Sequence, residues 1–386
     1  MERIYMDHAA TTPMDKRVAE AMTPIFTEVF GNPSSVHAFG RLARQYLDSA
    51  RRTLARSIQA REKEMIFTSG GTEADNLAII GTAMANRDKG NHIITTMQEH
   101  HAVLDAVQYL EEQGFHVTYL PVNETGIVSV DKLKEALTDE TIVVSVMYVN
   151  NETGVIQPIE AIGSLLKDHQ AMFHTDAVQA FGLLDIDVNR EGIDMLSASA
   201  HKINGPNGIG VLYAGDDIAM ASMQFGGEQE RKRRPGTENI PAAVGFKRAL
   251  ELAMEYKLVR NDVYEQYKQT FLEALANHNI RYYVNGDAEQ TVPSIVNISF
   301  PGTNVETLLT NFDLDGVAAS SGSACTAGSV EPSHVLAAMF GRGDERITNS
   351  IRFSFGAFNT IDNVSEAADR VAEIIKRLTN ERRQET

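Results

Sequence analysis

Between about residues 60 and 215, short apolar segments alternate with stretches of helical periodicity. This order is typical of repeated strand–helix–strand units, which place parallel strands in one sheet. Segment 142–149 is almost entirely apolar and rich in β-branched residues, so we expect a central strand that is covered on both faces. The sequence therefore predicts an α/β fold with a mainly parallel, seven-stranded sheet and helices on both faces. The expected strands are 65–68, 92–95, 117–120, 142–149, 171–174, 195–197 and 211–213.

The remainder of the chain predicts a second, smaller α+β domain. Residues 241–275 have a helical pattern with little turn chemistry, which indicates one or two long helices between two lobes. Two later segments, 293–300 and 350–355, alternate with a period of two and are expected to be strands, with helices between and after them. The expected domains are residues 14–256 (large) and residues 1–13 with 257–386 (small).

Charge and cysteine content exclude several classes of protein. The chain has 35 Lys and Arg against 52 Asp and Glu, a formal net charge of -17 at pH 7, so we expect no direct nucleic-acid ligand. No apolar run approaches the roughly 18 residues of a membrane span, and no apolar signal core follows Met1. The single cysteine, Cys325, forms no internal disulfide and builds no zinc site by itself. We therefore expect a cytoplasmic protein without a bound metal.

Segment 68–75, Thr-Ser-Gly-Gly-Thr-Glu-Ala-Asp, follows an expected strand and begins an expected helix. Backbone N–H groups point outward at such a turn, so Gly71 and Thr72 are candidates for an anion cradle. The alternative is an ordinary turn in which Thr72 is the N-cap and Asp75 is the acidic residue of the first turn. The segment matches neither a P-loop nor the dinucleotide fingerprint, and taken alone it favours the ordinary turn.

Two neighbouring strands are expected to end in chemically useful side chains, Asp176 after one and His201 with Lys202 after the next. Open α/β sheets bind ligands at the carboxyl ends of their strands, so these groups and the cradle are expected at one edge. Pyridoxal phosphate needs such a set: a lysine amine for a Schiff base, a carboxylate beside the ring nitrogen, and donors for the phosphate. Lys202, Asp176 and Thr72 offer one of each.

Two further side chains are expected at the same edge of the sheet. His100 follows the expected strand 92–95, and Asn151 follows the expected strand 142–149. A loop histidine is usually a cap or solvated, but an imidazole on the face of a cofactor ring can stack and move protons near pH 7. The plain interpretation of Asn151 is a turn residue. Their placement makes both of them candidates.

Residues 319–329 form a run of small residues that carries the only thiol of the chain. Such a run has little side chain to pack, so we expect a mobile loop at about 319–331 in which Cys325 is exposed and reactive. The alternative is a buried cysteine that acts as a small apolar residue.

Arg352 lies in an expected strand that is otherwise apolar at alternate positions. A buried arginine needs a partner, and its planar guanidinium group fits a carboxylate with two hydrogen bonds. A substrate carboxylate and an internal salt bridge are equally compatible with this segment.

Taken as a set, these residues resemble the cysteine desulfurases, which are fold-type-I pyridoxal-phosphate enzymes of the class V aminotransferase group. The resemblance covers essentially the whole chain. Its most specific feature is the combination of His201-Lys202, Asp176 with Gln179, and Ser-Ser-Gly-Ser-Ala-Cys ending at Cys325. The matching segments are 7–13, 30–35, 68–76, 99–100, 149–154, 176–179, 199–206, 234–237, 320–326 and 350–355.

The resemblance implies a role for each candidate. The catalytic residues would be Cys325 as the nucleophile, Lys202 as the covalent attachment point of the cofactor, and His100 stacked on its ring. Asp176 would pair with the ring nitrogen, and Gln179 would contact the phenolic oxygen. The other implied cofactor-binding residues are Gly71, Thr72, Ser199, His201, Asn151 and, from the partner subunit of a homodimer, Thr237. The implied substrate-binding residues are Arg352 and Asn151.

The implied reaction converts L-cysteine to L-alanine and leaves the sulfur as a persulfide on Cys325 for an acceptor protein. The short tail and residues 226–234 resemble Gram-positive-type desulfurases that supply a tRNA-thiolating enzyme, and an iron–sulfur scaffold is the other expected acceptor. The alternatives are a selenocysteine lyase, another pyridoxal-phosphate lyase or aminotransferase, and a non-catalytic sulfur carrier or scaffold. The loop at Cys325 favours desulfuration, because a transaminase needs no nucleophilic thiol there.

Overall fold

The computed structural model describes residues 2–322, 325–326, 329–330 and 332–384. The α-helices are α1 (Lys16–Glu28), α2 (Ala38–Ser57), α3 (Gly71–Asn76), α4 (Thr82–Ala85), α5 (His101–Glu112), α6 (Val130–Ala136), α7 (Ile159–Leu166), α8 (Ile240–Glu255), α9 (Lys257–Asn277), α10 (Val305–Leu314), α11 (His334–Phe340), α12 (Arg346–Asn349) and α13 (Ile361–Gln384). The strands are β1 (Ile4–Tyr5), β2 (Met65–Thr68), β3 (His92–Thr96), β4 (His116–Leu120), β5 (Thr141–Ser145), β6 (Met172–Asp176), β7 (Met195–Ser199), β8 (Gly210–Ala214), β9 (Tyr283–Asn285), β10 (Ile295–Ser299), β11 (Val317–Ala318), β12 (Cys325–Thr326), β13 (Ser329–Val330) and β14 (Ser350–Ser354). Shorter helical turns lie at Glu62–Glu64, Leu77–Gly81, Ala200–Lys202 and Gln229–Lys232.

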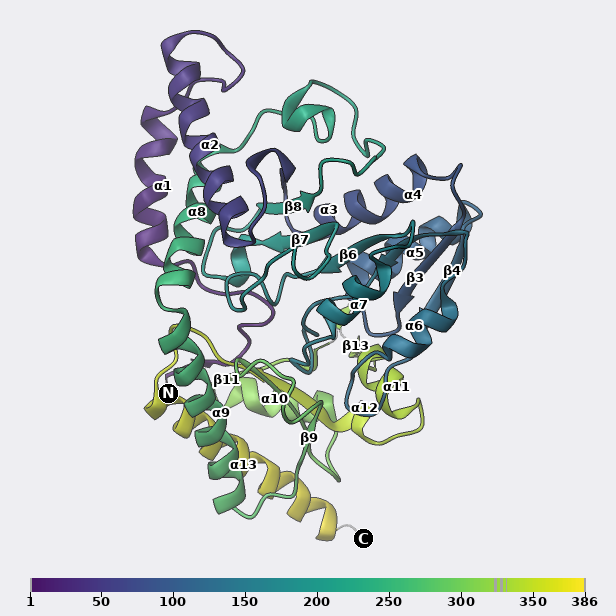
Figure 1. The fold of residues 1–386 in the computed structure, drawn as a ribbon. Coiled ribbons are helices and arrows are strands. Elements are labelled where there is room, and N and C mark those ends of the chain that lie inside the picture. The colour runs from purple at the N-terminus through teal and green to yellow at the C-terminus, as the bar shows by residue number, and fades with distance from the viewer. Residues whose placement is uncertain (1, 323–324, 327–328, 331, 385–386) are drawn as a thin grey trace.

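The central sheet has seven strands in the order β2-β8-β7-β6-β5-β3-β4 (Figure 1). Neighbouring strands from β7 to β4 are parallel, whereas β8 runs antiparallel to both β2 and β7. The prediction of a mainly parallel, seven-stranded sheet is therefore confirmed. Because the parallel strands share one direction, their carboxyl ends meet at one edge.

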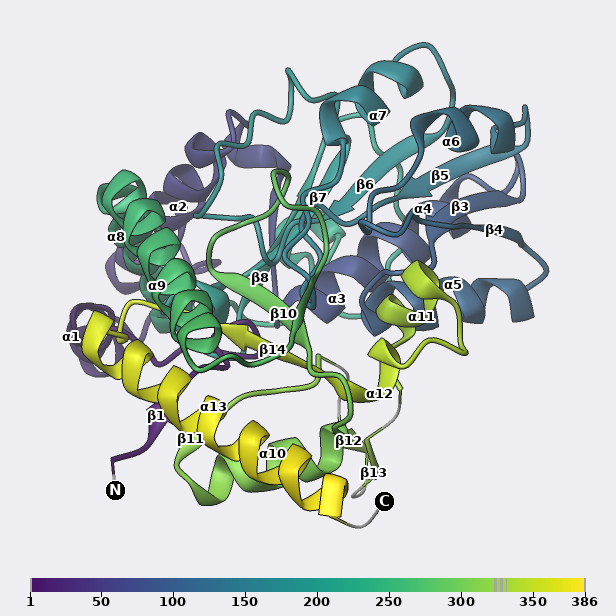
Figure 2. The same ribbon diagram turned by 90° about the horizontal axis from the view of Figure 1, so that it is seen from below.

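Both faces of this sheet are covered by helices, α6 and α7 on one side and α3, α4 and α5 on the other (Figure 2). Adjacent residues of a strand contribute to different apolar clusters: Ile93 and Val143 pack on the α5 side, and Ile94 and Val144 pack on the α6 and α7 side. Strands that bury both faces need nearly continuous apolar sequence. This requirement explains why the strands could be recognised from their composition.

The predicted strand 142–149 is shorter in the structure, where β5 ends at Ser145. Beyond that residue the backbone still pairs with β6 on one side. On the other side Met147 N donates to Glu99 Oε1 at 3.0 Å instead of to the backbone of β3. A carboxylate side chain thus replaces the strand ladder, and the chain turns toward the edge of the sheet where Asn151 lies.

The later part of the chain forms an antiparallel sheet in the order β14-β10-β9, beside the helices α9, α10 and α13 (Figure 1). Its apolar interior is a separate cluster that includes Ile4, Phe271, Phe353 and Val371, so residues near the N-terminus pack here and not in the large sheet. The helical segment 241–275 divides at Tyr256 into α8 and α9. The domain boundaries stay a prediction.

Candidate active site

A cavity of about 390 Å³ opens at the carboxyl ends of the parallel strands. The strands β3, β5, β6 and β7 lead into it, and β14 of the smaller sheet closes its opposite side. The predicted site residues that line the cavity are Gly71, Thr72, His100, Asn151, Asp176, Gln179, Ser199, His201, Lys202 and Arg352. The structure therefore brings together residues that lie far apart in the sequence.

Asp176 is the last residue of β6 and is buried in the floor of the cavity. Its Oδ1 accepts a hydrogen bond from Val178 N at 2.9 Å. Burial and the nearby Asp75 raise the pKa of Asp176 to about 6, because both disfavour the charged carboxylate. The Asp176 carboxylate has no strong cationic partner among the described residues, so it can pair with a cationic or N–H group of a ligand in the cavity.

Lys202 follows β7 in a short helical turn, and its amine lies in the cavity. Its Nζ donates to the backbone oxygens of Ala9 at 2.5 Å and Ala10 at 2.7 Å. Burial and the positive charge of Arg352 lower the pKa of Lys202 to about 8. A lysine with such a pKa is partly neutral near neutral pH, which is the form that attacks a carbonyl group.

Two histidines line the same cavity as this amine. His100 precedes α5, and its Nδ1 accepts from Ala102 N at 3.1 Å, so the neutral ring carries its proton on Nε2. Burial and Lys202 lower the pKa of His100. His201 Nδ1 lies 3.0 Å from Thr11 Oγ1, and burial and Lys202 lower its pKa to about 4. Both imidazoles are therefore neutral at pH 7.

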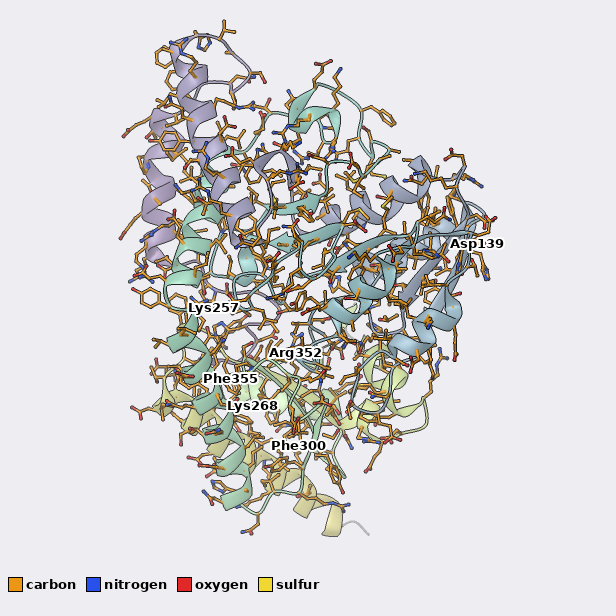
Figure 3. All side chains as sticks on the ribbon, viewed as in Figure 1. Asp139, Lys257, Lys268, Phe300, Arg352 and Phe355 are labelled. Atoms are coloured by element: carbon orange, nitrogen blue, oxygen red, sulfur yellow. The ribbon has the colours of Figure 1, made fainter. Side chains whose placement is uncertain are left out.

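Arg352 lies between the large sheet above it and the region of Phe300 and Phe355 below it (Figure 3). Its Nη1 donates to Asn151 O at 2.8 Å, and its Nη2 donates to Asp7 Oδ1 at 2.6 Å. Its buried Nε has no hydrogen-bond partner among the described residues. The internal salt bridge considered for Arg352 is present, and one donor remains for a further acceptor.

Sequence reasoning gave no site role to several carboxyl groups at this cavity. Asp7 pairs with Arg352, and the side chains of Asp75, Glu99 and Glu152 are buried at or beside the cavity. Burial raises the pKa of Asp75 and Glu152 to about 7 and that of Glu99 to about 8. The signal for Asp75, Glu99 and Glu152 was their position in the same motifs as Thr72, His100 and Asn151, respectively.

Two predicted residues are not placed in this cavity by the structure. Thr237 is exposed and does not line the cavity of its own chain. Cys325 has a described backbone in β12, which pairs with β13, but its side chain lies outside the described part of the chain. Residues 323–324, 327–328 and 331 of the expected mobile loop also lie outside it. The roles of Thr237 and Cys325 and the mobility of the loop stay predictions.

The donor set of the cavity fits a cofactor with an aldehyde, a basic ring nitrogen and an anionic group. A buried amine held by two carbonyl oxygens can exchange them for a covalent bond, and a buried carboxylate without a cation suits a protonated ring nitrogen. The helical run from α3 through Leu77–Gly81 to α4 begins at the cavity wall, where a Cβ on Gly71 would lie 2.8 Å from Val178 Cγ2. The first turn of this helix therefore packs against the residues that follow Asp176.

Known proteins similar to this chain agree with that chemistry. The family described as aminotransferase class-V matches residues 4–366. A protein of Bacillus subtilis (strain 168) named putative cysteine desulfurase IscS 1 is 58% identical over 98% of this chain and 100% of its own length. A structure described as a NifS-like protein has a TM-score of 0.90 at 33% identity and covers 97% of this chain and 100% of its own. A structure described as SspA in complex with cysteine has a TM-score of 0.81 at 35% identity and covers 92% and 99%.

No helix in the described part of the chain combines sufficient length with sufficient apolar character to cross a membrane.

Proposed function

The chain belongs to the aminotransferase class-V family, and from this premise we propose that it is a pyridoxal-phosphate-dependent cysteine desulfurase. It converts L-cysteine to L-alanine and holds the sulfur as a persulfide on Cys325. The observation that carries the proposal is the meeting, in one cavity, of the Lys202 amine, the Asp176 carboxylate and Arg352, whose Nε has no partner among the described residues. Similarity to a protein named cysteine desulfurase and to a structure described with cysteine supports the substrate.

Bound pyridoxal phosphate supplies an electron sink that weakens bonds at the α and β carbons of an amino acid. Lys202 Nζ is the group that holds it, and Asp176 is the partner of its ring nitrogen. Gln179 lies beside the same carbonyl oxygen, of Ala9, that accepts from Lys202, which supports its place next to the attachment point. The residues proposed for the phosphate are Gly71, Thr72, Ser199, His201 and, from the partner subunit, Thr237.

The substrate is bound by its carboxylate and activated at its thiol. Arg352 and Asn151 bind the carboxylate, and the guanidinium group gives a charge-assisted hydrogen bond in a buried place. His100 would stack on the cofactor ring, and its Nε2–H would donate a hydrogen bond to the sulfur of a substrate in the cavity. The neutral amine of Lys202 would serve as the base for the proton on the α carbon of the substrate.

Sulfur transfer needs no external oxidant. The Cys325 thiolate attacks the sulfur of L-cysteine, and a sulfur–sulfur bond forms as the bond between that sulfur and the β carbon breaks. The electron pair of the broken bond passes to carbon, which takes a proton and becomes the methyl group of L-alanine. Cys325 is thereby oxidised to the persulfide level, and the β carbon is reduced. Only the thiolate is a good nucleophile, so transfer requires deprotonation of Cys325.

We further propose a homodimer. The end of the molecule formed by α1 and α2 exposes Phe30, Val36 and Phe39, and the rings of Phe30 and Phe39 lie 5.1 Å apart. Phe225, in the segment that leads to Thr237, is 92% exposed. Exposed aromatic side chains of this kind are typical of protein interfaces. A partner covering them supports the idea that Thr237 of one chain serves the cavity of the other.

The proposed acceptor of the sulfur is a tRNA-thiolating enzyme, with an iron–sulfur scaffold as the second candidate, and the proposed location is the cytoplasm. Residues 226–234 support the first acceptor through their resemblance to desulfurases of that type. Transfer of labelled sulfur from the treated protein to each purified acceptor separates the two candidates.

The proposed function is tested by following the products made from L-cysteine. The purified protein is expected to be yellow, to lose its colour on borohydride reduction with the cofactor fixed to Lys202, and to release L-alanine from L-cysteine. C325A is expected to keep the colour and to lose L-alanine formation. A selenocysteine lyase would act on selenocysteine without Cys325, and a sulfur carrier would be colourless. Either result would overturn the proposal.

A further inference from the structure

The two described ends of the segment that carries Cys325 meet on one buried carboxyl group, that of Glu152. On one side, Ser333 Oγ donates to Glu152 Oε2 at 2.5 Å. On the other side, Gly322 lies directly against the same carboxyl: a Cβ on this glycine would lie 2.6 Å from Glu152 Cδ. Gly322 also has a φ of +90°, which a residue with a side chain rarely adopts. A glycine at this position thus permits the contact with Glu152.

Glu152 is itself held firmly by its neighbours. Its backbone N donates to Asn150 Oδ1 at 2.9 Å, and its backbone oxygen accepts from Asn297 Nδ2 in β10 at 3.3 Å. The preceding residue, Asn151, accepts from Arg352, the proposed ligand of the substrate carboxylate. The carboxyl group is therefore a fixed point between the substrate arginine and the two chain ends.

We propose that Glu152 is a positioning residue for sulfur transfer, whose carboxyl group fixes Gly322 and Ser333 relative to each other and to the cavity. The inference rests on the proposed desulfurase function. Fixing both ends of a short segment reduces the space its residues can explore, which raises the effective concentration of a group carried on it. Without the carboxyl group, the ends lose their common contact, and the thiol meets the substrate sulfur less often.

The hydrogen bond from Ser333 also connects this point to α11. Ser333 is the N-cap of that helix, and its Oγ accepts from Leu336 N at 3.1 Å while its hydroxyl proton goes to Glu152. A glutamine at position 152 keeps both the shape and an oxygen that accepts this proton. The E152Q variant therefore separates the contact from the negative charge.

The test compares cofactor-loaded full-length wild type, E152A and E152Q in two measurements after mixing with L-cysteine. The absorbance change of the cofactor reports substrate binding, and mass spectrometry of quenched samples reports the rate at which Cys325 gains a sulfur atom. E152A is expected to reach half of the absorbance change at the same L-cysteine concentration as wild type. Its rate of sulfur gain is expected to be about tenfold lower than that of wild type. E152Q is expected to remain within about threefold of wild type.

Two controls separate positioning from loss of folding. E191A removes another buried carboxyl, one that accepts from Tyr148 and Arg190 away from the cavity, and is expected to lose thermal stability without slowing sulfur gain. E152A/S333A is expected to gain sulfur no more slowly than E152A, because both changes remove the same contact between Ser333 and Glu152. The N-cap of α11 that S333A also removes is expected to affect thermal stability. Three results would each overturn the inference. E152A could gain sulfur at the wild-type rate, E152A could lose substrate binding by as large a factor as it loses its rate of sulfur gain, or E152Q could gain sulfur as slowly as E152A. A wild-type protein that gains no sulfur would overturn the proposed function and this inference with it.

Discussion

Arg51 in α2 and Arg352 in β14 are both buried, and each pairs with a carboxylate, but their remaining donors differ. Arg51 donates to both oxygens of Glu230 at 2.6 Å and to Met65 O at 2.7 Å, and its guanidinium group lies over the ring of Phe67. The side chains of Arg51 and Glu230 are 6% and 3% exposed. Protein groups thus enclose this ion pair on all sides.

Arg352 makes a single contact with its carboxylate and keeps a buried Nε without a described partner. Its partner Asp7 is 20% exposed, and the cavity lies beside the pair. An unsatisfied buried donor costs free energy, and this supports the proposal that Arg352 binds the substrate carboxylate. Burial and pairing are therefore common to both arginines, and the buried, unpaired Nε of Arg352 is the difference on which its proposed binding role rests.

The surroundings of Glu230 point to what the enclosed pair does. Glu230, Arg231 and Lys232 have φ values of 45°, 57° and 67°, in the left-handed region. Each such residue costs roughly 1–2 kcal/mol in free energy. The ion pair and a hydrogen bond from Phe67 N to Glu230 hold this strained turn against the large sheet.

The largest expected effect comes from breaking the enclosed pair. R51A leaves the Glu230 carboxylate buried without its cation, and we expect the free energy of unfolding to fall by about 3–5 kcal/mol. Urea denaturation measures this loss, and the kcat/KM of surviving folded protein for L-cysteine is expected to stay near that of wild type. The double variant R51M/E230L should recover most of the stability. An R51A protein as stable as wild type would show that the pair does not hold the turn.

The next effect comes from Arg352, where the loss is expected in catalysis. R352A removes the proposed ligand of the substrate carboxylate, and we expect kcat/KM for L-cysteine to fall on the order of 100- to 1000-fold, chiefly through KM. Steady-state formation of L-alanine measures the change. R352K keeps the charge without the planar group and should lie between R352A and wild type. An unchanged KM in R352A would show that Arg352, like Arg51, does not bind the substrate.

The smallest effect concerns Glu99, a buried carboxyl without a cationic partner among the described residues, in contrast to Glu230. Its pKa is raised from an ordinary value of 4.5 to about 8 by burial. Between these values the folded protein keeps a proton that the unfolded chain releases. The stability from this group is therefore full at low pH and is lost as pH rises to about 8.

The E99Q variant cannot ionise at this position, so it lacks that loss. We expect the free energy of unfolding of E99Q, relative to wild type, to rise by roughly 3 kcal/mol between about pH 5 and about pH 8. Urea denaturation at a series of pH values measures the difference. If the difference in free energy of unfolding between E99Q and wild type were constant across that pH range, Glu99 would not take up a proton on folding.

Much of the fold follows from local sequence, because strands that bury both faces have few compatible residues. The antiparallel direction of β8 had no such signal, since a parallel and an antiparallel central strand are equally apolar. Helix α2 was missed although Ala43, Leu47, Ala50 and Leu54 recur at helical spacing and are buried. Helix α1 was also missed, and it contains Pro24, which obscures a helical pattern.

Within the site, side chains at strand ends could be predicted, and groups supplied from a distance could not. Asp176 and Lys202 follow strands whose carboxyl ends meet at one edge. Asp7 meets Arg352 because β1 pairs with β11 and Asp7 itself forms a bridge with Ser354 of β14, and no local pattern reports a pair so far apart in sequence. The carbonyl oxygens of Ala9 and Ala10 that hold Lys202 are backbone atoms, which leave no trace in residue type.

The most direct test of the account is to locate the sulfur atom after a single turnover. The cofactor-loaded protein is mixed with L-cysteine, its thiols and persulfides are trapped by alkylation, and its peptides are identified by mass spectrometry. We predict one additional sulfur atom on the peptide that contains Cys325, in step with L-alanine release, and none in C325S. Release of L-alanine by C325S at the wild-type rate, or sulfur bound elsewhere on the chain, would contradict the account.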